Sequence, residues 1–257
     1  MQVSTVVRAE GAVLDRVLDA TYPASHQGLS REAFATFDAA LGKTAWARGH
    51  QRRYALIQGT DILASAQRCD LSGVLGEHAL RICGIGAVWS HPAHGDALHA
   101  RALIERLIDD ARRDGADLAM VCGSPASTIP VLGGFEMIPT HDVEVKVAES
   151  SRYGAPMTLV RGGEDRDLAA IVAMGQARAG RYRFHLDRDR DFVKYTITKR
   201  RLLAGLGASA ARQLVFVIAE ERITAAAYAV ISMAVGRSRN AAIVTRLERV
   251  WVPSCRP

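Results

Sequence analysis

Three histidines stand close together in one polar stretch of the sequence and are the first candidates for chemistry. His91, His94 and His99 follow the spacing H-x2-H-x4-H. A histidine can ligate zinc, or act as a general base near neutral pH. No fourth ligand follows at a matching spacing, so we expect these side chains to face solvent and predict no metal site.

The cysteines and the absence of several catalytic motifs exclude further kinds of chemistry. Cys69, Cys83, Cys122 and Cys255 lie far apart and form no C-x-x-C pair, which argues against a thiolate metal site and a disulfide framework. This usage favours a reducing, cytoplasmic environment. The sequence also has no nucleophile elbow, no P-loop and no H-E-x-x-H helix. It therefore lacks the signatures of serine hydrolases, P-loop nucleotide hydrolases and zinc proteases.

Length, composition and charge limit the number of domains and the classes of protein to which the chain can belong. The chain has 257 residues, of which 49% are hydrophobic, and fits one large or two modest domains. No apolar run reaches the roughly 18 residues that a membrane helix needs, so we expect neither a transmembrane span nor a signal peptide. The net charge is +6, but acidic residues alternate with the densest basic stretch, 178–201. That alternation is typical of a solvated helix face, and we do not expect nucleic-acid binding.

The elements around the histidines predict how that stretch is placed. Residues 80–89 form an apolar run with Gly84 and Gly86, which predicts a central strand with either a bulge or a close backbone approach. Apolar residues then recur at helical spacing from Ala100 to Ala111, and residues 118–122 predict a second buried strand. A helix between two apolar strands favours a right-handed parallel crossover. Loop 90–99 then lies at the carboxyl end of the sheet, where ligands bind in open α/β sheets.

The N-terminal elements precede this crossover. Val6 and Val7 predict a short strand, and the next apolar residues share one helical face over 13–18. A second helix is predicted over 31–41. Residues 54–66 predict two strands joined at Gly59, because glycine can adopt the positive φ of a tight hairpin.

The second half repeats part of this order. Residues 160–172 match the first strand and helix, and residues 213–228 match the first hairpin. Nothing after Ser232 matches the crossover. Residues 237–257 contain five arginines and one acidic residue. Two interpretations remain open: a truncated second unit with a tail that is not native to the fold, or a divergent edge strand followed by a disordered terminus. In both interpretations, we expect the second half to pack against the first, because it cannot bury both faces of its sheet alone.

The element order and three sequence strings together resemble the GNAT acetyltransferase superfamily. The strings are Ile85-Gly-Ala-Val-Trp-Ser-His-Pro-Ala-His94, Arg101-Ala-Leu-Ile-Glu-Arg-Leu-Ile108 and Gly134-Phe-Glu-Met-Ile-Pro139. The resemblance implies an α/β fold with a mixed, mostly antiparallel central sheet flanked by helices, followed by a second partial unit of the same kind. It implies a GNAT-like domain over 1–150, a partial second one over 156–236 and a divergent basic tail over 237–257.

The resemblance also implies a co-substrate and its binding residues. GNAT proteins transfer an acetyl group from acetyl-CoA to an amine. Backbone groups at a strand end hold the pantetheine, and amides at a helix N-terminus hold the pyrophosphate, because exposed N–H groups and the helix dipole favour anions. By resemblance, the strand residues are Val88, Trp89 and Ser90. The loop residues are Gly95, Asp96, Ala97, Leu98, His99 and Ala100.

Departures from the family pattern keep a second interpretation open. Asp96 and Leu98 stand where the family has glycines, and Gly95 stands where it has arginine. An aspartate near two phosphates costs about 1 kcal/mol or more at an effective dielectric near 20. Pro130 replaces the family's tyrosine acid, Ser124 is a weak substitute, and no catalytic base can be named. The first expectation is an N-acetyltransferase for a small-molecule or peptide amine, and the alternative is a catalytically inactive or truncated GNAT-like binding module.

Overall fold

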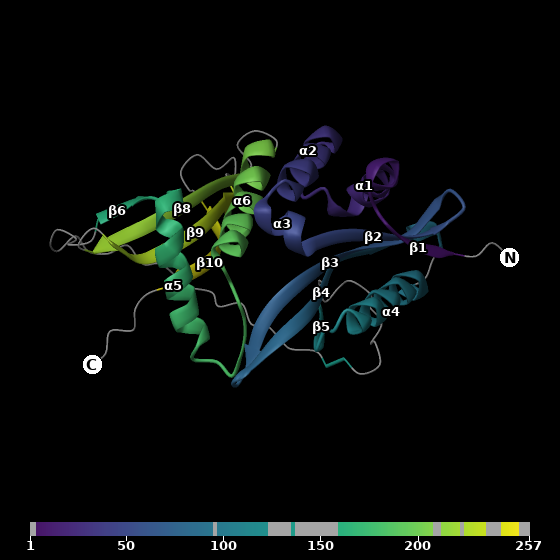
Figure 1. The fold of residues 1–257 in the computed structure, drawn as a ribbon. Helices are drawn as coiled ribbons and strands as arrows, with labels where there is room; N and C mark the ends of the chain where they lie inside the picture. Colours follow the sequence, from purple (N-terminus) through teal and green to yellow (C-terminus); the bar gives the residue numbers. More distant parts are fainter. Residues whose placement is uncertain are drawn as a thin grey trace.

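Two β-sheets with helices packed on them make up the chain (Figure 1). The computed structural model describes residues 4–94, 97–122, 135–136, 159–207, 212–221, 224–234 and 243–251. Within these residues, no helix is both long and apolar enough to cross a lipid bilayer.

The first sheet is mixed and mostly antiparallel, as the sequence predicts. Its strands run in the order β1-β2-β3-β4-β5, with β7 added to β3, and β4 and β5 form its parallel pair. The β2–β3 turn has Gly59 at φ +55°, so the predicted hairpin is confirmed. The strands are β1 (Thr5–Arg8), β2 (Gln51–Gln58), β3 (Asp61–Leu75), β4 (His78–Ser90) and β5 (Leu118–Val121).

Helices cover both faces of this sheet (Figure 1). One face carries α1 (Gly11–Ser25), α2 (Arg31–Gly42) and α3 (Ala45–His50), and the other carries α4 (Ala97–Arg113). Ser30 and Thr44 cap α2 and α3, each accepting a hydrogen bond from the backbone N–H three residues later. α3 was not predicted, because a helix of six residues has too few turns for a periodic pattern.

The predicted crossover is present as β4–α4–β5. Leu103, Ile104 and Leu107 of α4 are fully buried against the sheet, where they pack with Cys83 and Ile85 of β4. After α4, a turn at Gly115, with φ +84°, leads the chain into β5. The helix therefore begins beside the end of β4, where the sequence analysis places an anion site.

The second sheet has the order β10-β9-β8-β6, all antiparallel. The hairpin predicted over 213–228 is present as β8 and β9, and α5 and α6 pack on one face of the sheet. Part of the expected tail, residues 243–251, forms an edge strand on β9. The elements are β6 (Leu159–Gly162), α5 (Leu168–Ala179), β7 (Phe184–Leu186), α6 (Arg190–Leu206), β8 (Arg212–Glu221), β9 (Thr224–Ala234) and β10 (Ile243–Trp251).

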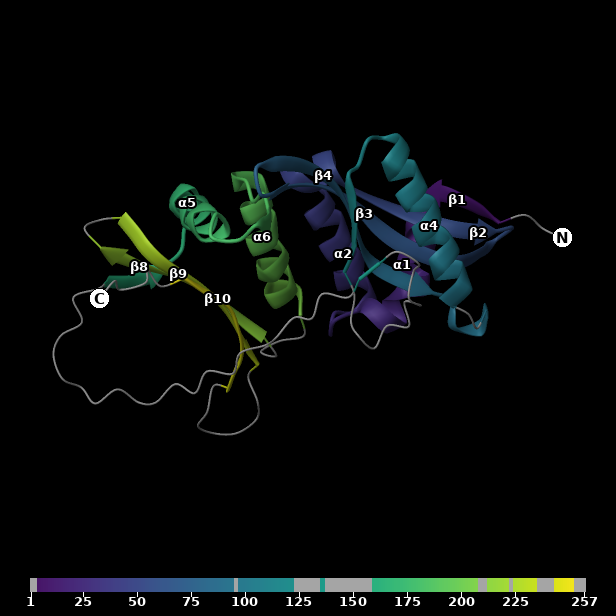
Figure 2. The same ribbon diagram turned by 90° about the horizontal axis from the view of Figure 1, so that it is seen from below.

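Two elements from the second half complete the first sheet and its helical layer. β7 pairs antiparallel with residues 73–75 of β3, and α6 stands between the two sheets (Figure 2). The stretch 178–201 is therefore not one solvated helix face as predicted. Alternating charge occupies the exposed positions, but Val193, Tyr195 and Ile197 of α6 are buried. The second half packs against the first through this helix.

Candidate active site

The candidate site is the C-terminal end of β4, beyond its described pairing with β5. Their parallel register runs from Ile82 opposite Leu118 to Ile85 opposite Val121. One further hydrogen bond joins the backbone N–H of Cys122 to the carbonyl of Ile85, at 2.7 Å. β4 continues to Ser90, paired with β3, but the described register with β5 goes no further. A free strand edge can hydrogen-bond an extended ligand.

A bulge in β4 lies just beyond this pairing. Between Ser65 and Gln67 of β3 the partners on β4 jump from Trp89 to Gly86, so β4 has an extra residue. Ala87 adopts φ +48°, a conformation that non-glycine residues seldom take. The sequence analysis expected a bulge or a close approach at Gly84 and Gly86, and the structure places the bulge just after Gly86.

The two glycines of β4 have different surroundings. A Cβ atom at Gly84 would lie 2.7 Å from Cδ1 of Leu71 and 3.4 Å from the carbonyl oxygen of Cys69. At Gly86 the nearest atom would be the carbonyl oxygen of Cys122, at an ordinary 3.8 Å. Gly84 therefore makes room for Leu71, whereas Gly86 leaves the face of β4 without a side chain beside β5.

The strand residues expected to hold the co-substrate lie at this bulge. Val88 packs against the core under α4, whereas Trp89 packs on the opposite face, near α1. The Trp89 ring meets the His91 ring edge-on, with 5.6 Å between centroids. Ser90 pairs with Ala64 of β3 and ends the strand. The bulge thus shifts the alternation along β4 by one residue, so that Val88 follows Ile85 on the α4 face and Trp89 lies on the opposite face.

The loop residues are only partly described. Ala97, Leu98, His99 and Ala100 form the first turn of α4, whereas Gly95 and Asp96 lie outside the described residues. Ala100 is buried at 5% exposure and fixes the helix on the sheet, but Leu98 is 63% exposed. An apolar side chain therefore projects from the helix start where the resemblance implies bound phosphates.

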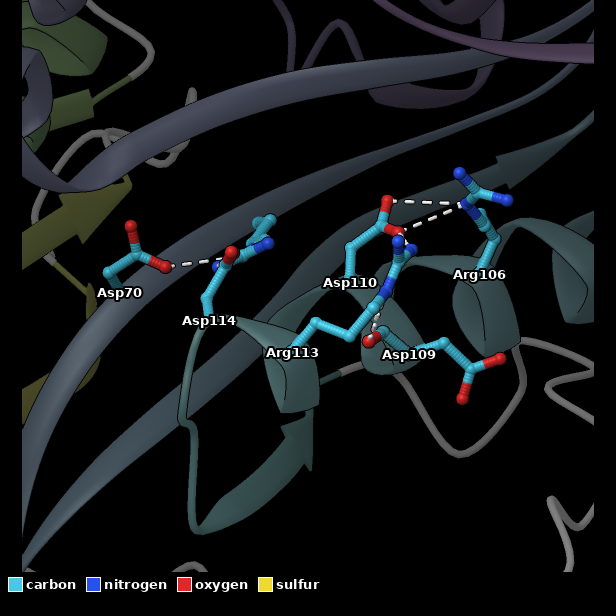
Figure 3. Close-up of polar contacts among 7 residues, drawn as sticks. Asp70, Arg106, Asp109, Asp110, Arg113 and Asp114 are labelled. Atoms are coloured by element: carbon cyan, nitrogen blue, oxygen red, sulfur yellow. Dashed lines mark hydrogen bonds and ion pairs between the residues drawn. The ribbon is translucent and has the colours of Figure 1, made fainter.

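Ion pairs hold α4 in place along its polar side. Arg106 and Arg113 both pair with Asp110, the former at 3.1 Å (Figure 3). Arg68 of β3 pairs with Asp114, just after the helix, at 2.8 Å and with Asp70 at 3.1 Å. The pairs within the helix are exposed and contribute a few tenths of a kcal/mol each. The contact from Arg68 joins the end of α4 to the sheet.

Two thiols near the end of the β4–β5 pairing are not activated. Burial raises the pKa of the Cys69 thiol to about 12, and burial likewise raises the pKa of Cys83, so both stay protonated at neutral pH. Nδ1 of His91 accepts a hydrogen bond from the backbone N–H of Ala93, at 3.2 Å. Across the described ranges, no group of three or more potential ligands could hold a metal ion.

An open groove of about 540 Å³ lies between α1 and the β2–β3 turn, and the sequence analysis did not predict it. Its charged groups are engaged with the protein: Arg16 donates to the carbonyl of Thr60, and Asp19 pairs with Arg31 at 2.6 Å. No motif could have indicated it, because its walls come from three separate elements. The lining residues are Arg16, Asp19, Ala20, Thr60, Asp61, Ile62 and His91.

The other expected acid positions are not described. Ser124 and Pro130 lie outside the described residues, as does Gly134 of the Gly-Phe-Glu string. Phe135 is described and packs against the core formed by α4 and the sheet.

Comparison with solved structures shows the fold. A GCN5-related N-acetyltransferase from Anabaena variabilis matches with a TM-score of 0.63 and 12% identity, over 91% of this chain and 56% of that one. A probable N-acyltransferase from Enterococcus faecalis matches with a TM-score of 0.57 and 12% identity, over 92% of this chain and 56% of that one. A GCN5-related N-acetyltransferase from Kribbella flavida matches with a TM-score of 0.53 and 13% identity, over 92% of this chain and 55% of that one.

The chain is thus structurally similar to GNAT N-acetyltransferases, and it spans little more than half the length of these three. No protein-family profile and no curated protein matches the sequence. Identities of 12–13% between similar folds indicate a shared architecture with few shared side chains.

Proposed function

We propose that the N-terminal unit, residues 1–150, transfers an acetyl group from acetyl-CoA to an amine. The observation that carries this proposal is the bulge of β4 at Ala87, which lies just beyond the described β4–β5 pairing and beside the start of α4. The backbone at the end of β4 would hydrogen-bond an extended amide-containing chain such as pantetheine, and the start of α4 lies next to the same strand end. The GNAT-like fold supports the assignment.

The chain's own residues have two tasks in this proposal. Backbone groups of Val88, Trp89 and Ser90 hold the pantetheine, and the loop and first turn over 95–100 hold the phosphates. Acetyl-CoA would supply an activated thioester, and the protein positions an amine against it. Rate enhancement then comes mainly from orientation and from removal of the amine's proton, through water where no side chain is close. The protonated thiols of Cys69 and Cys83 take no part.

The second candidate is a GNAT-like protein that binds a partner and has lost catalysis. The specific observation in its favour is the exposed Leu98 at the start of α4. Asp96 and Pro130 support it through their side-chain chemistry, because a carboxylate repels phosphates and proline has no proton to donate.

We further propose that residues 156–236 form a partial second GNAT-like unit and that 237–257 diverge from it. The order β6–α5–α6–β8–β9 supports this, because it repeats the strand, helices and hairpin of the first unit. The edge strand β10 is consistent with the divergent edge strand that the sequence left open.

Thermal melting against acetyl-CoA tests the catalytic proposal. A ligand at a hundred times its dissociation constant adds about 2.7 kcal/mol of stability, so a saturable rise in Tm is expected, with free CoA giving a smaller one. A positive shift is followed by assay of released CoA thiol over a panel of amines. A cooperative melt with no shift would favour the binding module.

The loop gives a sharper prediction. The double change Asp96→Gly with Leu98→Gly is expected to tighten acetyl-CoA binding by about tenfold or more, because it removes an anion and an apolar side chain from the phosphate region. Isothermal titration measures the change, and Asp109→Gly with Leu118→Gly, which changes the same residue types away from the loop, is the control. Unchanged affinity in the loop variant would show that phosphates bind elsewhere.

A further inference from the structure

One face of the second sheet carries helices and the other does not. Within the described part of the chain, the helices that pack on this sheet are α5 and α6, and both lie on the same side of it (Figure 2). Ile218 of β8 is fully buried beneath them and pairs with Tyr228 of β9. We call this side the helix face and the opposite side the open face. No described helix covers the open face, whereas the first sheet has α4 on the side away from α1, α2 and α3.

The strand register shows which residues occupy the open face. Residues alternate between the two faces along a strand, so the neighbours of Ile218 and Tyr228 occupy the open face. Between Gln213 at one end of β8 and the bulge after Ala219 at the other, every paired position on this face is apolar. In β6 and β10 these positions are valine, glycine or leucine. In β8 and β9 the central ones are Val215, Val217 and Ala219, paired with Ile231, Ala229 and Ala227.

The open face is large enough for a stable interface. Its strands have 4, 10, 11 and 9 residues. With strands about 4.8 Å apart and a rise of about 3.4 Å per residue, the flat outline of the face is about 550 Å². A protein rarely leaves a continuous apolar area of several hundred Å² in water. Two copies packed through this face would bury about 1,100 Å², and a specific interface needs roughly 1,000 Å².

The sizes of the residues along the open face fit a twofold arrangement. Near the β8–β9 turn the face has Ala219 and Ala227, whereas toward the other end of these strands it has Ile231 and Met233. A twofold axis perpendicular to the strands reverses their direction in the second copy, so the large residues of one copy meet the small residues of the other. No charged residue occupies a paired position between these ends, so like charges do not meet.

We propose that the open face of the second sheet is a dimerisation surface and that its occupant is the same face of a second copy of this chain. The two sheets pack face to face about 10 Å apart, and the association is driven by burial of apolar surface. The second copy then covers the second sheet as α4 covers the first. This inference goes beyond acetyl transfer and does not depend on it, because no residue of the candidate active site takes part.

Sedimentation of the full chain over a wide range of concentration tests the proposal. The wild type is expected to form a dimer of twice the 27.8 kDa chain mass. Val217→Lys and, separately, Ile231→Lys should each weaken the dimer about a hundredfold or more, because each copy would bury an unpaired charge. Leu118→Lys, at a 40% exposed strand position of the first sheet, is the matched control and should leave the dimer unchanged.

Two further measurements do not depend on how a lysine variant folds. The Tm of the wild type should rise with protein concentration, because the dimer forms only from folded chains. Val217→Thr, which keeps the shape of the side chain and adds a hydroxyl, should weaken the dimer about tenfold. Circular dichroism shows whether each variant keeps its secondary structure, as we expect for a change on a face that is open in the monomer.

Three results would overturn the proposal. A wild type that is monomeric at every concentration, with a constant Tm, would mean that another part of the chain or another protein covers the face. A dimer that persists in all the open-face variants, or that Leu118→Lys weakens equally, would place the association on another surface. Assemblies that grow beyond a dimer would indicate pairing between strand edges instead of sheet faces.

Discussion

Asp167 is a buried acidic side chain whose charge is matched by its neighbours. It is 5% exposed and accepts hydrogen bonds from Nη1 and Nη2 of Arg161, at 2.9 and 2.7 Å, and from the backbone N–H of Glu164. These contacts, the arginine first, lower the pKa of the Asp167 carboxyl below its ordinary 3.8. Because the folded pKa is the lower one, the charged form stabilises the fold above about pH 4, and that stability is lost as pH falls through the folded value.

Replacement of this carboxylate should therefore be costly and pH-dependent. Asp167→Asn is expected to lower the free energy of unfolding by about 3 kcal/mol at pH 7, because the buried two-point contact with Arg161 loses its negative charge. The difference from wild type should shrink as pH falls below about 4. Urea titrations at several pH values measure both effects.

Asp165 is the matched control, since it also pairs with a cation but is 57% exposed. Asp165→Asn is expected to cost less than about 1 kcal/mol. A cost for Asp165→Asn as large as that for Asp167→Asn would contradict the role assigned to burial.

At the scale of elements, β7 depends on a close backbone approach that only glycine allows. A Cβ atom at Gly73 of β3 would lie 2.8 Å from the backbone carbonyl oxygen of His185 and 2.8 Å from Cδ1 of Ile82. Gly73→Ala is expected to lower stability by about 1–3 kcal/mol, because backbone must move to admit the methyl group. Hydrogen exchange at Asp187, whose N–H bonds the carbonyl of Ser72, should show β7 opening more often.

Gly175, in the middle of α5, has no atom within 4 Å of an added Cβ and provides the comparison. Gly175→Ala should raise stability by about 0.5–1 kcal/mol through helix propensity. An increase in stability in Gly73→Ala as well would mean that β7 does not pack on β3 as described.

The sequence predicted those elements whose residues interact locally. The β2–β3 hairpin, the β4–α4–β5 crossover and the β8–β9 hairpin follow from periodic apolar residues and turn glycines over a short span. The attachment of β7 to β3 could not be predicted, because its partner lies roughly 110 residues away and three residues carry no period. Gly73, read alone, gives no sign of which strand approaches it.

In the candidate site, too, local features could be predicted from the sequence and long-range ones could not. Val88, Trp89 and Ser90 were placed at a strand end by their sequence, whereas the left-handed Ala87 depends on the strand register.

At the scale of the whole molecule, α6 joins the two sheets through an aromatic cluster. The Trp46 ring lies 4.9 Å from that of Phe192 and 4.5 Å from that of Tyr195, between centroids. The Tyr195 hydroxyl donates a hydrogen bond to Oε1 of Gln51, at 3.1 Å. These contacts should make both halves unfold together.

Trp46→Ala is expected to lower stability by about 3–5 kcal/mol and to separate the single unfolding transition into two. Differential scanning calorimetry would show both effects, and Tyr182→Ala, a change at a 58% exposed ring, should alter neither. Two transitions already present in the wild type would show that α6 does not couple the halves.

The shared edge of β3 has a consequence for synthesis of the chain on the ribosome. Residues 72–75 of β3 are complete long before β7, which pairs with them, has been made. At about 5–20 residues per second, the interval is roughly 6–20 s. Throughout it this edge offers unpaired N–H and C=O groups to any other nascent strand. Translation speed between the two strands, and chaperones that shield strand edges, should therefore control how much of the newly made protein reaches its native pairing.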